Sequence, residues 1–124
     1  MTDLVVSTLP KTWIFDLDGV LVEHNGHRRG DDRVLPGVKE FFAALPLEDV
    51  VIILTARTEA DAGATRRRLQ DEGLRYNHLI FGCPVGERVL LNDRKPSGLA
   101  TALAINLRRD QGLTGLSIQT DPAL

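Results

Sequence analysis

The chain has 124 residues, of which 43% are hydrophobic and 26% are charged, and its formal net charge at pH 7 is −2. This length suits a single domain over residues 1–124, and so small a charge gives no electrostatic case for binding nucleic acid or an anionic membrane surface. Cys83 is the one cysteine, no leader or apolar run of about 20 residues is visible, and a cytoplasmic location is therefore expected.

Residues 1–10 are expected to be a loosely held lead-in, and the first strand is predicted over residues 13–17. This apolar run ends on Asp16 and Asp18, and Gly19 then allows a tight turn. Carboxylates at the end of such a strand lie where open α/β sheets bind ligands, and Mg²⁺ is a suitable partner for them. Asp and Gly are also ordinary turn residues, so this segment alone equally fits a plain turn.

Asn25 and Gly26 lie within a second pattern, the stretch 20–28. Asn-Gly between two candidate strands is the strongest short signal for a β-hairpin, because both residues tolerate a positive φ. His24 and His27 flank this turn. No third histidine or cysteine completes a metal set with them, so a turn-flanking role fits them better.

The remainder of the chain alternates helical and strand patterns. The spacing of apolar residues predicts helices over 36–45 and 97–112, and the capping residues Thr58 and Gly73 predict a helix over 58–73. Apolar runs predict strands over 50–54, 79–81, 88–91 and 116–118. Strands that alternate with helices form a parallel, doubly wound sheet with right-handed crossovers. The predicted fold class is therefore α/β.

Polar residues follow three of the predicted strands. They are Asp16-x-Asp18-Gly19-Val20, then Leu54-Thr55-Ala56-Arg57, and last Asn92-Asp93-Arg94. This set resembles the motifs of the haloacid dehalogenase (HAD) superfamily of aspartate-nucleophile phosphohydrolases, and the resemblance spans roughly residues 12–95. It implies a three-layer Rossmann-like fold with a small β-hairpin flap at residues 20–28.

Larger members of this superfamily carry a cap domain over the active site. Only about a dozen residues separate the first motif from Val34, and neither this gap nor the one between the second and third predicted strands can hold a cap. A small capless member is therefore expected. Its open active site would be covered by the flap or by a neighbouring subunit of a homo-oligomer.

The resemblance assigns a role to each motif residue. Asp16 would be the nucleophile that forms an aspartyl-phosphate, and Asp18 the general acid and then base. Mg²⁺ would bind the Asp16 carboxylate, the Asp18 carbonyl and Asp93. The Thr55 hydroxyl and the Ala56 N–H would bind phosphoryl oxygens, although a lone Thr at this place also fits simple helix entry.

One motif departs from the superfamily pattern. Small capless relatives carry a lysine in a Phe-Gly-Lys-Pro string, where this chain reads Phe81-Gly82-Cys83-Pro84. Losing one preorganised donor of this kind costs about 10²–10³ in rate. Arg57, Arg94 or Lys95 could supply the missing charge, and Lys95 is favoured because its turn directly follows the metal motif. Each of the three also fits a solvated surface charge.

The function predicted on this basis is a Mg²⁺-dependent phosphomonoesterase for a small phosphorylated metabolite, such as a sugar phosphate or a nucleotide. The alternative is a catalytically weakened relative that binds a phosphorylated ligand or a protein partner, and Cys83 in place of lysine motivates it. A third reading is phosphatase action on a nucleic-acid 3′-phosphate, since an uncapped site is accessible. The near-neutral charge gives that reading little support.

Overall fold

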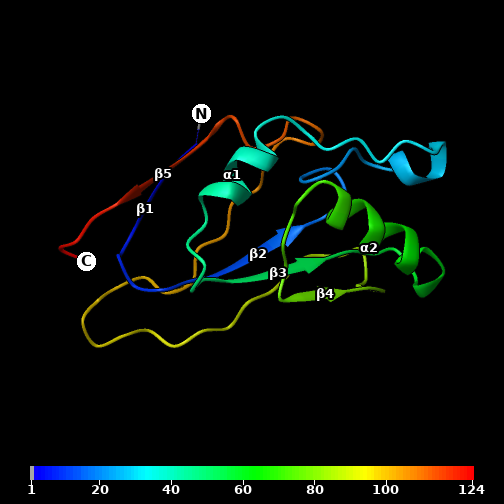
Figure 1. Cartoon of the computed structure of the whole chain (residues 1–124). Helices are drawn as coiled ribbons and strands as arrows, with labels where there is room; N and C mark the ends of the chain where they lie inside the picture. Colours follow the sequence, from blue (N-terminus) through cyan, green and yellow to red (C-terminus); the bar gives the residue numbers. More distant parts are fainter. Residues whose placement is uncertain (1) are drawn as a thin grey trace.

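The computed structural model describes residues 2–124 and is an α/β structure with parallel strands. Its elements in chain order are β1 (Thr2–Val6), β2 (Thr12–Asp16), the 3₁₀ helix η1 (Gly26–Arg29), α1 (Val38–Ala44), β3 (Val50–Leu54), the 3₁₀ helix η2 (Glu59–Asp61), α2 (Ala62–Asp71), β4 (His78–Ile80) and β5 (Leu116–Thr120). One parallel sheet has the order β2-β3-β4, and β1 and β5 form a separate parallel pair (Figure 1). The α/β class and the parallel pairing are confirmed.

The core lies between the sheet β2-β3-β4 and the two helices. Side chains alternate between the faces of a strand, so Phe15, Val51 and Ile53 all point to one face of the sheet. Phe42 of α1 and Leu69 of α2 are buried in the same cluster, so both helices cover this one face (Figure 1). Burying a side chain of this size contributes about 1.5–3 kcal/mol.

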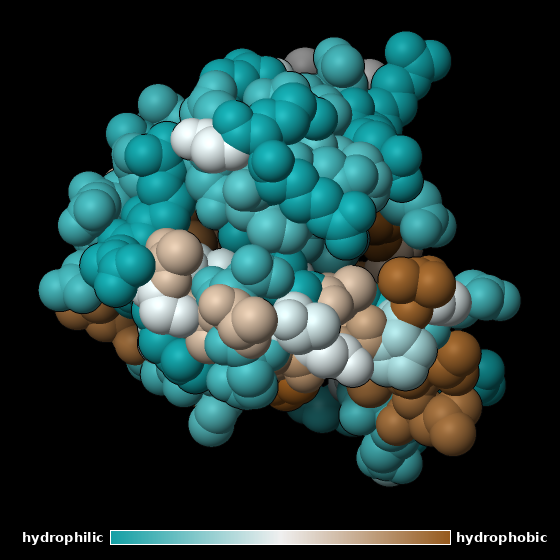
Figure 2. Space-filling model, turned by 90° about the vertical axis from the view of Figure 1, so that its right-hand side faces the viewer, coloured by the Kyte–Doolittle hydropathy of each residue, from teal (hydrophilic) through white to brown (hydrophobic). Residues whose placement is uncertain are grey.

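The opposite face of this sheet is less covered. Ile14 and Ile80 point to it and are 51% and 46% exposed. The family resemblance implied a three-layer fold and the sequence predicted a helix over residues 97–112, but the segment 81–115 contains neither helix nor strand. Apolar residues also gather on the lower part of the surface that Figure 2 shows, below a hydrophilic upper part.

The predicted helix at 97–112 is wrong for this structure, and local hydrogen bonds show what replaces it. The Ser97 Oγ accepts the Leu99 N–H at 3.4 Å, and the Gly98 N–H closes a turn on the Lys95 carbonyl at 2.9 Å. Leu103, on the expected apolar stripe, is 48% exposed. Helices in proteins depend mainly on packing of such a stripe, and here it has little to pack against.

The predicted strand at 88–91 is also absent. Val89 and Leu91 are 80% and 90% exposed, and the segment has no neighbouring strand. The Arg88 side chain instead turns back to the Pro84 and Gly86 carbonyls. An apolar run becomes a strand only where another strand accepts its backbone hydrogen bonds, and none does so here.

The N-terminal segment is more ordered than the sequence indicated. Residues 2–6 form β1, which pairs along its whole length with β5. The lead-in prediction is therefore corrected for these residues, and Met1 lies outside the described part. The predicted last strand is confirmed and extends to Thr120. The pairing joins residues from opposite ends of the chain, which local sequence patterns do not reveal.

The predicted flap folds back on itself but is not a two-stranded hairpin. A single antiparallel bridge joins Val22 to Val34, and the turn contains η1 rather than two residues. Asn25 has the expected positive φ of 57°. Gly26 is needed for close approach, since a Cβ there would lie 2.2 Å from the Asp31 carbonyl oxygen. This contact closes a longer loop.

No helix within residues 2–124 has the length and apolar character that crossing a membrane requires.

Candidate active site at the carboxyl ends of β2 and β3

Two of the predicted motifs meet at one edge of the sheet. Asp16 is the last residue of β2 and pairs in register with Leu54, the last residue of β3. The chain therefore delivers Asp18 and Thr55 side by side just beyond the strands. This is the carboxyl edge at which open α/β sheets bind ligands.

The Asp18 carboxylate is held by both residues of the second motif that carry polar side chains. Its Oδ2 accepts the Thr55 hydroxyl at 2.8 Å, and its Oδ1 accepts Nε and Nη2 of Arg57 at 3.0 and 2.9 Å. Thr55 is fully buried, and its Oγ1 also accepts the Arg57 backbone N–H at 3.0 Å. The Thr55 hydroxyl proton is thus engaged by Asp18 rather than free for a phosphoryl oxygen.

Arg57 is buried, with a side chain only 2% exposed, and it also binds residues outside the motifs. Nη1 and Nη2 donate to the two carboxylate oxygens of Asp32 at 2.8 and 2.7 Å, and Nη1 donates to the Thr65 hydroxyl at 3.0 Å. An arginine has five N–H donors, so all of them are used by the chain itself. Arg57 has none left for the phosphate that the sequence assigned to it.

The charges explain why a buried arginine is stable here. Burial lowers the pKa of Arg57, but the hydrogen bonds that it donates to Asp32 and Asp18 outweigh this and raise its pKa above the usual value. The guanidinium therefore stays charged between two carboxylates. Nothing in the sequence indicates this role for Asp32, because an Asp in a loop carries no signal of a partner so distant in the chain.

Asp16 lies in a different environment from Asp18. Its side chain is half-exposed, and burial of the remainder, together with the nearby Asp18 charge, raises its pKa. The Arg88 guanidinium, the Leu17 N–H and His24 oppose this rise without cancelling it. Asp16 is thus an accessible carboxylate whose negative charge is not fully compensated.

The cation nearest to Asp16 is one that the sequence did not nominate. Nη2 of Arg88 lies 4.0 Å from the Asp16 Oδ1. The sequence offered Arg57, Arg94 and Lys95 as sources of the missing positive charge, and it placed Arg88 in a predicted strand. Of those three, Arg57 is spent on Asp18 and Asp32, and Arg94 and Lys95 are exposed in a later loop.

The backbone of Cys83 lies at the same edge of the sheet. The Cys83 N–H donates to the Thr55 carbonyl at 3.0 Å, and the neighbouring Gly82 N–H donates to the Arg57 carbonyl at 2.8 Å. The thiol lies 3.7 Å from the Ile80 carbonyl, to which it donates. Position 83 is therefore adjacent to the second motif, where its side chain supplies no charge.

Two backbone donors at this edge have no acceptor. Within residues 2–124, the N–H groups of Asp18 and Ala56 make no hydrogen bond to the protein. They follow adjacent parallel strands, so they are candidates to donate to an anionic group bound beside Asp16. The predicted role of Ala56 is compatible with this placement.

The fourth motif is not assembled with the others. Asp93 is exposed, its carbonyl accepts the Thr101 hydroxyl, and Asn92 Nδ2 donates to the Thr101 carbonyl at 3.1 Å. These bonds close a local loop. Across the described residues 2–124, no three His, Cys, Asp or Glu side chains gather in a group that could hold a metal ion.

The loop that follows Asp18 is clamped by a residue near the C-terminal end. The Asp110 N–H donates to the Gly19 carbonyl at 2.9 Å, and its Oδ1 accepts the His24 N–H at 2.7 Å. Asp110 itself has a φ of 63°, which is unusual for a residue other than glycine. This contact fixes the loop from outside the predicted motifs.

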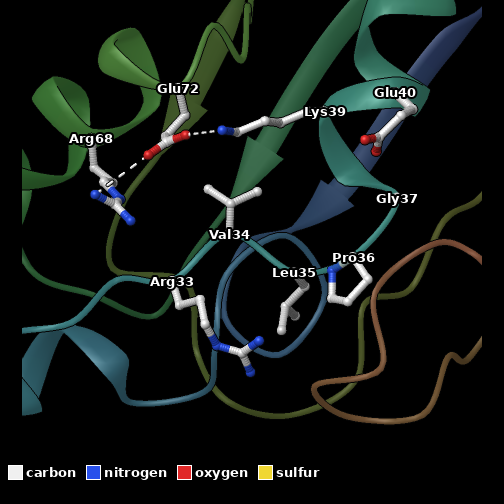
Figure 3. A pocket seen from close by; sticks show the side chains of 9 residues that line it. All are labelled: Arg33, Val34, Leu35, Pro36, Gly37, Lys39, Glu40, Arg68 and Glu72. Atoms are coloured by element: carbon white, nitrogen blue, oxygen red, sulfur yellow. Dashed lines mark ion pairs between the residues drawn. The ribbon is translucent and has the colours of Figure 1, made fainter.

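The candidate site is separate from the hollow that Figure 3 shows. A hollow of about 340 Å³ lies elsewhere, between the start of α1 and the end of α2 (Figure 3). Asp16, Asp18 and Thr55 are not among the residues that line it.

Comparison of the chain with protein-family models, curated proteins and solved structures gave no match. The chemistry of the site is therefore argued from its own residues.

Proposed function

We propose that this protein is a Mg²⁺-dependent phosphomonoesterase, related to the HAD-like phosphatases, that acts on a small phosphorylated metabolite such as a sugar phosphate or a nucleotide. The observation that carries the proposal is the pair of aspartates at the carboxyl edge of β2. Asp16 is accessible and undercompensated, while Asp18 is held by Thr55 and Arg57. The division of roles follows accessibility, because the Asp16 side chain is 50% exposed and can meet a phosphoryl group, whereas that of Asp18 is 17% exposed.

In the proposed reaction, an oxygen of Asp16 attacks phosphorus and the bond to the leaving oxygen breaks. Asp18 gives a proton to that oxygen, and an aspartyl-phosphate remains. A water molecule, which returns its proton to Asp18, then attacks phosphorus and releases inorganic phosphate and the free Asp16 carboxylate. Both Arg57 bonds fall on Oδ1, so Oδ2 is the oxygen of Asp18 with a lone pair left to carry the proton.

The residues present fit a magnesium ion in part. The Asp16 carboxylate, with its raised pKa, and the Asp18 carbonyl are suitable oxygen ligands. Asp93 would complete the set only if its loop approached Asp16. When bound, Mg²⁺ would neutralise charge at the phosphoryl group.

The proposed relationship extends to the fold. In a HAD-like three-layer arrangement, residues 97–112 would cover the exposed sheet face at Ile14.

A second candidate function is a binding protein for a phosphorylated ligand, without turnover. Its support is specific: Cys83 brings no charge, every Arg57 donor is used internally, and within residues 2–124 Asp93 forms no metal-binding group with Asp16 and Asp18. The placement of Asp16, Asp18 and the Ala56 N–H together at the carboxyl edge of β2 and β3 favours the enzyme over this alternative.

The test is a phosphatase screen with p-nitrophenyl phosphate, sugar phosphates and nucleotides, with Mg²⁺ and with EDTA. We expect release of inorganic phosphate that requires Mg²⁺, and equal release by the control variant Asp71→Asn, at an exposed position of α2. Binding of a phosphorylated compound with no turnover under any condition would favour the binding protein. Turnover unchanged by EDTA would remove Mg²⁺ from the proposal.

Arg88 provides a second prediction. Removing one preorganised cation costs up to about 10²–10³ in rate, and the effect should lie at the lower end here because Arg88 is partly exposed and 4.0 Å from Asp16. We expect Arg88→Gln to lower kcat accordingly. Adding Cys83→Lys to that variant should recover part of the loss, whereas Cys83→Lys alone should change kcat little. Equal kcat for Arg88→Gln and wild type would show that Arg88 is not the compensating cation.

A further inference from the structure

Asp32 is bound to the candidate site more firmly than its position in a loop indicates. Its two carboxylate oxygens accept Nη1 and Nη2 of Arg57 at 2.8 and 2.7 Å, and its side chain is only 14% exposed. This is the planar, two-bond pairing of a guanidinium with a carboxylate, the most directional ion pair available to proteins. The other side of the same guanidinium binds Asp18.

Arg57 therefore transmits the position of Asp32 to Asp18. Asp18 receives Nε and Nη2, while Asp32 receives Nη2 and Nη1, so the two carboxylates fix the plane of the guanidinium between them. Without Asp32, only the Thr65 hydroxyl would still hold Nη1. The guanidinium could then turn, and Asp18 Oδ1 would lose its fixed partner.

The backbone of Asp32 is anchored as well. Arg68 Nε donates to the Asp32 carbonyl at 2.8 Å, and Arg68 Nη1 is itself paired with Glu72 at 3.4 Å. Figure 3 shows Glu72 between Arg68 and Lys39, whose Nζ lies 2.5 Å from it. One helix residue thus holds the carbonyl of Asp32 while Arg57 holds its carboxylate.

The residues that follow Asp32 are hydrogen-bonded to the other side of the loop, which argues against this segment acting as a mobile lid. Directly after Asp32, the Arg33 carbonyl accepts the Glu23 N–H at 2.9 Å, and Val34 makes the antiparallel bridge to Val22. Asp32 is thus fixed at the base of the loop, at the point where the chain returns to the core. An anionic ligand could not take its place on Arg57 without breaking this base.

We propose that Asp32 is a positioning residue, which holds Arg57 so that Asp18 keeps its Oδ1 engaged and its Oδ2 available as the proton carrier. This role rests on the proposed function of Asp18. Reacting groups displaced by about 1 Å can lose about 10² in rate, so a loosened Asp18 should slow the reaction more than it weakens binding.

The experiment compares Asp32→Ala and Asp32→Asn with Asp31→Ala, whose residue is exposed and next in the chain. With p-nitrophenyl phosphate and Mg²⁺, we expect Asp32→Ala to lower kcat by about 10²-fold with KM changed by less than about threefold. Asp32→Asn keeps one acceptor oxygen and should lie between it and wild type. Asp31→Ala should match wild type.

A second measurement does not require turnover. In ¹⁵N- and ¹³C-labelled protein, the Arg57 Nε–Hε signal should exchange slowly with water and the Asp18 carboxyl carbon should give one sharp signal. Both should change in Asp32→Ala and remain as in wild type in Asp31→Ala. If Asp32→Ala fails to fold, Asp32→Asn serves for both measurements.

The outcomes separate this proposal from the proposed function. A rise in KM with kcat unchanged would make Asp32 a substrate contact, and a gain in kcat/KM would show that it blocks Arg57; either result overturns positioning. Unchanged Arg57 and Asp18 signals would overturn it too. If the wild type has no turnover but these signals do change, the phosphatase proposal fails, while the hold of Asp32 on Asp18 is supported.

Discussion

Asp16→Asn is expected to lower turnover by about 10⁴-fold or more, because the amide has nearly the shape of the carboxylate but is a poor nucleophile. Asp16 is the accessible aspartate of the pair, and Asp18 is tied to Thr55 and Arg57. The measurement is the release of inorganic phosphate with Mg²⁺, together with mass spectrometry for phosphate trapped on Asp16. A variant that retained a tenth of wild-type turnover would remove Asp16 from the nucleophile role.

The same variant should keep its fold and gain a little stability at neutral pH. The pKa of Asp16 is raised in the folded state, so its favourable contribution is complete below the unfolded pKa near 3.8 and is lost as the pH rises through the folded value. Asparagine carries no charge and avoids that loss. Half of the side chain faces water, so the gain should be under about 1 kcal/mol.

Urea unfolding at pH 7 and at pH 3 would measure this gain. The advantage of Asp16→Asn over wild type should be present at pH 7 and shrink at pH 3, where Asp16 becomes protonated. Asp71→Asn, at an exposed position of α2, is the matched control and should show no such advantage. A destabilised Asp16→Asn at pH 7 would mean that the carboxylate makes a favourable contact absent from the structure.

Local sequence patterns were sufficient where an element carries its own evidence. The apolar runs of β2 and β3, the helical spacing of α1 and the capped pattern around α2 all predicted the observed elements. The register between β2 and β3 then places Asp18 beside Thr55. This part of the site is predictable, because strands that are both apolar and parallel must end at the same edge.

The remainder depends on contacts between distant residues. Asp32 and Arg88 approach the aspartates from loops, and Asp110 reaches the loop after Asp18 from near the other end of the chain. A charged loop residue has the same local pattern whether it faces water or a partner. Its role becomes visible only when the fold brings the two together.

In the region after β4, the sequence patterns predicted elements that do not form. Residues 88–91 and 97–112 have the apolar patterns of a strand and a helix, yet neither forms. Pattern alone gives a segment the capacity for such an element, but the stability comes from a neighbouring strand or a packed face. The role of Asp93 depended on the predicted strand before it, and without that strand nothing delivers Asp93 to the edge of the sheet that carries Asp16.

Arg57→Met is expected to cause the largest loss of stability of any single change in this site, about 3–5 kcal/mol in the free energy of unfolding. Methionine occupies a similar volume, so the loss reports charge rather than a cavity. Asp18 and Asp32, which are 17% and 14% exposed, would be left without their common partner. Removal of one member of a buried ion pair costs more than the pair contributes, because the remaining charge stays desolvated.

Urea unfolding at pH 7 tests this against Arg67→Met, an exposed arginine of α2 that should change stability by less than about 0.5 kcal/mol. Adding Asp32→Asn to Arg57→Met removes one unpaired charge, so the double variant should be more stable than Arg57→Met alone, although Asp32→Asn by itself should destabilise the wild type. That reversal of sign is the signature of a shared ion pair. A cost for Arg57→Met no larger than that for Arg67→Met would show that Arg57 does not hold the two carboxylates in solution, and the Asp18 geometry on which the proposed reaction depends would lose its support.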